Sequence, residues 1–208
     1  MANTSRANGF RPVKHLSGAP YNGQFNLYEI VAGDGTATFI GDLVKADGGT
    51  ATDVYPTCIR AGTTGEVTSG LLLGAVVGFV VPVSGGGTGS TAGTQPALDF
   101  PFYRAASTKR YAMVADAPDL LFECMDGGTV PATLTLIGNN TGFMATAGST
   151  STGLSNMTTG TTAPTTTNSL PLKIMQIINS PDNASASAYQ RLLVMINQHY
   201  YMGGQTAT

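Results

Sequence analysis

The chain has 208 residues, of which only 11% are charged, and its formal net charge at pH 7 is −2. Soluble domains usually carry about 25% charged residues, so this chain has few titratable groups for a reaction. Its ten basic residues are scattered, which argues against binding nucleic acid through phosphate neutralisation. The longest apolar run, residues 71–81, is too short for a membrane-spanning helix. No signal peptide is visible at the start.

The first 24 residues are predicted to form an extended arm. Asn-Gly pairs at positions 8–9 and 22–23 favour turns, and Pro12 and Pro20 disfavour a helix. The arm is expected to be separable from the β domain that follows it, residues 25–208. Deleting the arm is therefore expected to leave the secondary structure largely unchanged.

Three strands are predicted after the arm. In residues 25–31 the side chains alternate with a period of two and are rich in β-forming types. A turn at 33–35 then leads to a second strand at 37–45, and Gly48-Gly49 joins it to a third at 55–60. The apolar run at 71–81 predicts a fourth strand. Two glycines inside that run, Gly74 and Gly78, indicate a bulge or a close approach of backbone.

The second half of the chain alternates between predicted strands and long polar segments. Residues 84–95 and 138–168 are rich in Gly, Ser and Thr, so flexible loops are predicted there. Further strands are predicted at the following segments: 111–115, 120–124, 129–137, 170–178 and 191–198. The pattern predicts a mainly β fold, either a β-sandwich of jelly-roll type or a small β-barrel.

Residues that could carry out a reaction are few, and no catalytic, cofactor-binding or metal-ligating residue is predicted. The two histidines, His15 and His199, lie outside any recognisable motif. Asp116 and Asp119 flank a proline turn, where aspartates commonly accept backbone hydrogen bonds; this explains them without a calcium site or a glycosidase pair. The chain is therefore expected not to be an enzyme.

The two cysteines, Cys58 and Cys124, make neither a disulfide framework nor a zinc-binding spacing. Isolated thiols packed in the core are expected, since free cysteine behaves as a small apolar group. The sequence leaves open whether the two instead form a disulfide with each other.

Aromatic and basic side chains in the arm and after the first loop suggest an interface, because aromatics and arginine concentrate at the energetic centres of interfaces. Two of the aromatics lie in extended segments that contain proline. The residues predicted to contact a capsid or another subunit are Phe10, Arg11, Pro12, Val13, Lys14, Tyr21, Phe102, Tyr103 and Arg104.

Several blocks of the sequence resemble virion structural proteins of tailed bacteriophages. The blocks are residues 9–15, 18–23, 39–44, 103–108, 111–119 and 191–201. The resemblance implies a head decoration (cement) protein, a small β-rich protein that binds the outside of an icosahedral capsid as a symmetric oligomer. It also implies a jelly-roll or related β fold, and it supplies no catalytic residues.

The resemblance further implies the partners and the location of the protein. The expected partners are the major capsid protein and copies of the chain itself, as a homodimer or homotrimer, with neither nucleic acid nor membrane. The expected location is the outer surface of the virion, after synthesis in the host cytoplasm. One alternative is a tail or neck adaptor, or a fibre-base protein. Another is a carbohydrate-binding or hydrolytic β domain, suggested by the aromatics and the Asp116/Asp119 pair.

Overall fold

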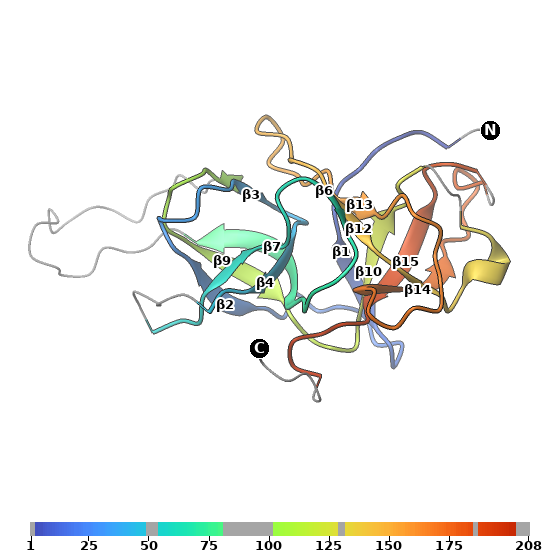
Figure 1. The fold of residues 1–208 in the computed structure, drawn as a ribbon, viewed down its shortest axis with the longest axis horizontal. Helices are drawn as coiled ribbons and strands as arrows, with labels where there is room; N and C mark the ends of the chain where they lie inside the picture. The colour runs from blue at the N-terminus through green and yellow to red at the C-terminus, as the bar shows by residue number, and fades with distance from the viewer. Residues whose placement is uncertain (1–2, 49–53, 81–101, 129–131, 185–186, 203–208) are drawn as a thin grey trace, which may run out of the picture.

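The computed structural model describes residues 3–48, 54–80, 102–128, 132–184 and 187–202. Within this part of the chain, regular structure consists of fifteen β-strands and one short 3-10 helix, η1 (Leu134–Leu136). The predicted mainly β fold is therefore confirmed. The strands gather into two lobes that lie side by side (Figure 1).

The first lobe contains a five-stranded antiparallel sheet and a smaller three-stranded sheet that packs on it. In spatial order, the larger sheet consists of β1 (Arg11–His15), β10 (Leu120–Met125), β15 (Arg191–Ile196), β14 (Leu172–Ile177) and β11 (Asn140–Thr141). The smaller sheet consists of β13 (Thr158–Thr159), β12 (Phe143–Ala145) and β6 (Gly65–Val67).

The second lobe is a five-stranded sheet that curls until its two edge strands meet. In spatial order it consists of β2 (Asn26–Ile30), β9 (Arg110–Ala115), β7 (Gly74–Val80), β4 (Leu43–Ala46) and β5 (Cys58–Arg60). The backbone N–H of Glu29 donates to the carbonyl of Pro56 at 2.8 Å, and Glu29 pairs with Thr57 in parallel. This contact closes a small barrel, which removes the exposed edges that an open sheet would have.

A two-stranded ribbon, β3 (Thr38–Phe39) and β8 (Tyr103–Arg104), extends from the barrel. The predicted strand at 37–45 is divided into β3 and β4, because the chain turns at Gly41 with a φ of +91°. A Cβ at Gly41 would lie 2.8 Å from the carbonyl oxygen of Asn8, so only glycine fits this turn.

Both glycines of β7 have the roles that the sequence predicts. The register between β7 and β9 shifts between Val76 and Gly78, which marks a bulge. At Gly74 an added Cβ would collide with the carbonyl of Ala115, because the two backbones approach closely there. The predicted bulge and the predicted close approach are both confirmed.

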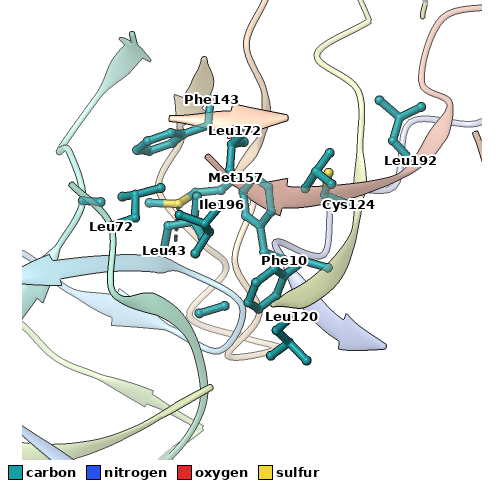
Figure 2. Packing of buried hydrophobic residues seen from close by; sticks show 14 of the residues in the cluster. Phe10, Leu43, Leu72, Leu120, Cys124, Phe143, Met157, Leu172, Leu192 and Ile196 are labelled. Atoms are coloured by element: carbon teal, nitrogen blue, oxygen red, sulfur yellow. Dashed lines mark hydrogen bonds between the residues drawn. The ribbon is translucent and has the colours of Figure 1, made fainter. Parts of the chain in front are cut away.

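Two hydrophobic clusters hold the fold. One fills the barrel and includes Ile30, Cys58 and Phe79. The other cluster joins the lobes, since it contains Leu43 of the barrel together with Ile196 of the neighbouring sheet (Figure 2). The two lobes therefore share a core.

Both cysteines are buried free thiols, as expected. Cys58 lies in the barrel cluster and Cys124 lies in the shared cluster, so the two are not paired. Burial raises the pKa of both thiols, which keeps them protonated and unreactive.

The prediction of a strand at 129–137 is wrong for the described residues 132–137, which contain the 3-10 helix η1. Leu134 is 75% exposed and Ile137 is 39% exposed. Alternation stabilises a strand only when one face is buried against a neighbour, and these side chains have no such face. The predicted loop at 138–168 is also partly wrong, because it contributes the short strands β11, β12 and β13. The predicted loop at 84–95 lies outside the described residues.

The predicted separable arm is instead part of the fold. Strand β1 pairs with β10 along its length, and the chain folds back so that the Tyr21 N–H donates to the Val13 carbonyl at 2.9 Å. Phe10 is 0% exposed and lies in the shared core (Figure 2). Earlier still, the Asn3 side chain exchanges two hydrogen bonds with the backbone of Ala184. The segment thus supplies both a buried aromatic ring and an edge strand, so the five-stranded sheet is incomplete without it.

Replacing Phe10 with alanine is expected to destabilise the fold by about 3–5 kcal/mol, because a fully buried aromatic ring leaves a cavity between the lobes. The free energy of unfolding from urea titration measures this loss. The control is Leu16→Ala, whose side chain is 54% exposed and which is expected to change stability by less than about 0.5 kcal/mol. Equal stability of the two variants would contradict this placement of Phe10.

Candidate functional site

The structure does not bring the predicted contact residues together at one surface. Phe10 and Arg104 are buried, so neither is a surface contact, and these two predictions are corrected. On β1 the exposed side chains alternate: Arg11 and Val13 face solvent, and Arg11 pairs with Glu123 at 3.1 Å. Phe102 is 71% exposed. The remaining members of the set are half-buried: Pro12, Lys14, Tyr21 and Tyr103.

A group of three aromatic side chains lies at the β3–β8 ribbon, and we call it the aromatic corner; of the three, Phe102 is exposed, Tyr103 is half-buried and Phe39 is buried. It consists of Phe39, Phe102 and Tyr103, which rest on Gly148 and Gly153. The rings of Phe39 and Tyr103 stack with centroids 5.1 Å apart and planes 12° apart. A side chain on Gly148 would collide with the Phe39 ring, and one on Gly153 would collide with Phe102. The glycines therefore let a neighbouring loop support the aromatic corner closely.

Arg104 fixes the backbone that carries the aromatic corner. Its side chain is fully buried, and it forms an ion pair with Asp34 at 3.0 Å. Its other N–H groups donate to the carbonyls of Val31, Asp34, Thr36 and Thr108 at 2.6–2.9 Å. All five guanidinium donors are thus used, which fixes the backbone next to Phe102 in one position.

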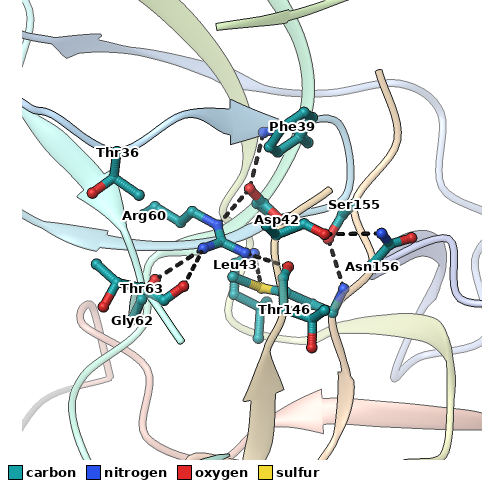
Figure 3. Close-up of polar contacts among 12 residues, drawn as sticks. Thr36, Phe39, Asp42, Leu43, Arg60, Gly62, Thr63, Thr146, Ser155 and Asn156 are labelled. Carbon is teal, nitrogen blue, oxygen red and sulfur yellow. Dashed lines mark hydrogen bonds and ion pairs between the residues drawn. The ribbon is translucent and has the colours of Figure 1, made fainter. Parts of the chain in front are cut away.

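A second buried ion pair supports the same region (Figure 3). Arg60 donates from Nε to Asp42 Oδ2 at 2.8 Å, and the same oxygen accepts the backbone N–H of Phe39 at 2.9 Å. The other end of the Arg60 guanidinium donates to the carbonyls of Thr63 at 3.0 Å and Thr146 at 2.5 Å. This network connects the barrel strand β5, the ribbon strand β3 and the end of β12.

Replacing Arg104 with lysine is expected to destabilise the protein, although the charge is retained. An ammonium has three donors, so at least two of the five buried hydrogen bonds are lost at roughly 1–3 kcal/mol each, or about 2–6 kcal/mol together. Urea unfolding measures the effect. The matched control is Arg11→Lys, at an arginine whose side chain is 59% exposed, where a change below about 0.5 kcal/mol is expected. A loss at Arg104 as small as at Arg11 would contradict the anchoring role.

A groove lies where the end of β1, the start of β2 and the turn after β9 meet the C-terminal segment. We call it the tyrosine groove, and its volume is about 460 Å³. Its lining residues are His15, Tyr21, Gln24, Phe25, Asn26, Asp116, Ala117, Pro118 and Tyr201. The size falls within the range of about 300–1,000 Å³ that is typical of small-molecule sites.

A directed chain of hydrogen bonds runs along the base of the tyrosine groove. Tyr28 donates its hydroxyl proton to Asp116 Oδ2 at 2.6 Å. The Tyr28 and Tyr201 hydroxyl oxygens are 2.7 Å apart, and Tyr28 has no second proton, so Tyr201 must be the donor. Asn26 Nδ2 lies 3.0 Å from both oxygens of Asp116. Burial is the main cause that raises the pKa of Tyr28, and the hydrogen bond to Asp116 raises it further, so the Tyr28 hydroxyl keeps its proton.

The structure pairs the polar groups that the sequence treats as unrelated. His15 Nδ1 lies 3.1 Å from Asp119 Oδ1, and His199 is buried with its Nδ1 accepting the backbone N–H of Tyr201 at 3.1 Å. Asp116 and Asp119 therefore bond to residues distant in sequence, so their local turn does not account for both side chains. The sequence signal that was missed is the pair of tyrosines at the C-terminal end, whose partners only the fold reveals.

Burial lowers the pKa of His199, and the nearby Asp116 carboxylate opposes this less strongly. The unfolded chain therefore binds a proton at His199 more readily than the folded chain does. Stability from this residue is present above the ordinary histidine pKa of about 6.5 and falls as the pH drops below it. In His199→Asn, the loss of stability between about pH 7 and pH 5 is expected to be smaller than in the unchanged protein. Thermal melts across this range measure the difference, and parallel curves would contradict it.

The described residues contain no group of three or more His, Cys, Asp or Glu side chains that could hold a metal ion. Nor do they contain a helix long and apolar enough to cross a membrane. The chain matches no protein-family model, no curated protein and no solved structure.

Proposed function

We propose that this chain is a decoration (cement) protein of a tailed-phage head. It binds the outer surface of the icosahedral capsid and stabilises the contacts between major capsid proteins. Its partners are the major capsid protein and further copies of itself, as a homodimer or homotrimer. The proposal draws on the sequence blocks that resemble this family, and the aromatic corner is the structural observation that supports it.

The aromatic corner has the properties of a protein-binding anchor. Phe102 is 71% exposed, whereas Tyr103 and Arg104 directly after it are held by stacking and by buried hydrogen bonds. An exposed ring on a fixed base loses little conformational freedom on binding, so more of its burial energy contributes to affinity. Aromatic anchors of this kind are the usual energetic centres of interfaces.

The low charge of the surface also suits extended contact with a shell. Several of the few charged residues are buried in ion pairs within the protein, as Asp42 and Arg60 are, so fewer charges lose water when two surfaces meet. A capsid presents the same site many times. If the protein binds as an oligomer, each bound subunit raises the effective concentration of the next, and modest individual contacts add up to firm attachment.

Phe102→Ala is expected to weaken binding to heads stripped of the protein by about thirtyfold, which corresponds to the roughly 2 kcal/mol of an interface hot spot. Co-sedimentation with stripped heads measures the affinity. The matched control is Leu134→Ala, because Leu134 on η1 is 75% exposed but lies outside the aromatic corner. The melting temperature of both variants is expected to equal that of the unchanged protein.

Equal loss in both variants, or no binding of the unchanged protein to stripped heads, would contradict the proposal. Negative-stain imaging of labelled protein separates the two structural roles. Dense and regular labelling over the head supports a cement protein, whereas a few copies at one vertex would instead indicate a neck or tail adaptor.

A further inference from the structure

We propose that the tyrosine groove binds a neutral saccharide. This inference goes beyond capsid binding and does not depend on it, because the groove and the aromatic corner are separate sites. In Figure 1 strand β3, which carries Phe39 of the aromatic corner, lies on the upper side of the barrel lobe. The C-terminal segment, which carries Tyr201 of the groove, lies at the lower edge. A protein attached through the corner therefore leaves the groove open.

The aromatic side chains of the groove suit the apolar face of a sugar ring. Phe25 is 44% exposed and Tyr201 is 52% exposed, although both line a concave site. The Tyr201 ring is positioned edge-on against Tyr200, with centroids 5.3 Å apart, and the Tyr21 hydroxyl donates to the Gln24 carbonyl at 2.8 Å. Rings held in this way offer flat apolar contact area at a small entropic cost.

The unused hydrogen-bonding capacity of the groove suits hydroxyl groups. A carboxylate has about four acceptor positions, and those of Asp116 receive one bond from Tyr28 and two contacts from Asn26. Tyr201 donates its only hydroxyl proton to Tyr28, so the Tyr201 oxygen can still accept a hydrogen bond from a ligand. Within the described residues, the Gln24 side-chain amide has no hydrogen bond and can both donate and accept. A sugar hydroxyl, which does both, can be matched by this mixture.

The charges around the groove select against ionic ligands. Asp116 lines the groove, Asp119 lies 3.1 Å from the lining residue His15, and no lysine or arginine occurs among the described residues that line the groove. This arrangement repels phosphates, nucleotides and acidic sugars. Asp119 is already paired with His15, and Asp116 is already hydrogen-bonded to Tyr28 and Asn26. The carboxylates thus leave less uncompensated charge for a cationic peptide, and a neutral polyhydroxyl ligand is the better match.

The test is an array of immobilised oligosaccharides that contains neutral glucose, mannose, galactose and N-acetylglucosamine series together with sialylated and sulfated series. The full chain is expected to bind at least one neutral series. Phe25→Ala and Tyr201→Ala are each expected to weaken that binding at least tenfold. Phe102→Ala is the control, because this aromatic side chain is 71% exposed but does not line the groove. Melting temperatures show whether each variant is folded.

Salt concentration separates a neutral sugar from a basic partner. Binding to the neutral series is expected to persist in about 1 M NaCl, where the screening length is only about 3 Å. An array without signal for the folded protein, a preference for anionic sugars, or unchanged binding of Phe25→Ala and Tyr201→Ala would overturn the proposal. So would binding of an oligolysine peptide, in place of the sugars, that high salt abolishes.

The two proposals fail independently. If both are correct, Phe102→Ala keeps sugar binding and loses head binding, whereas Tyr201→Ala shows the opposite pattern. Loss of both activities in Tyr201→Ala with an unchanged melting temperature would show that the groove is part of the capsid interface and would overturn the saccharide assignment.

Discussion

The hydrophobic core shared by the two lobes is the constraint on which the rest of the structure depends. The barrel and the neighbouring sheet each have their own strand order, but Leu43 from one and Phe122 from the other belong to the same hydrophobic cluster, which also contains Phe10. A rigid junction holds the strands that meet at the tyrosine groove, which come from both lobes. The N-terminal segment is therefore structural, because the sheet that it completes buries one side of this core.

Two buried ion pairs, Arg60 with Asp42 and Arg104 with Asp34, fix the geometry of several turns. Arg60 and Arg104 have nearly all of their side chains inside the protein, where they donate hydrogen bonds to backbone carbonyls of turns. Such groups are strongly destabilising when only one partner is removed, so they fix loop geometry more than they add net stability. Around the β3–β8 ribbon they hold Phe102 exposed.

The strands that the sequence predicts well share one property: their apolar residues face a core on at least one side. The strand predicted at 111–115 corresponds closely to β9, and the one predicted at 120–124 corresponds closely to β10. The prediction fails at Leu134, where alternating residues meet no partner strand. The prediction of Arg104 as a contact residue is also wrong. A guanidinium suits an interface and a buried position that binds backbone carbonyls equally well, so the sequence does not distinguish the two.

The sequence by itself determined the β class, the glycine positions where backbones approach and the scarcity of reactive groups, because these follow from local periodicity, side-chain size and composition. Only the tertiary structure decided which residues are exposed and which polar groups are paired. Tyr28 and Tyr201 are 173 positions apart and meet because β2 and the C-terminal segment converge on the same face. Local patterns carry no information about such pairs, since their partners are set by how the two lobes pack.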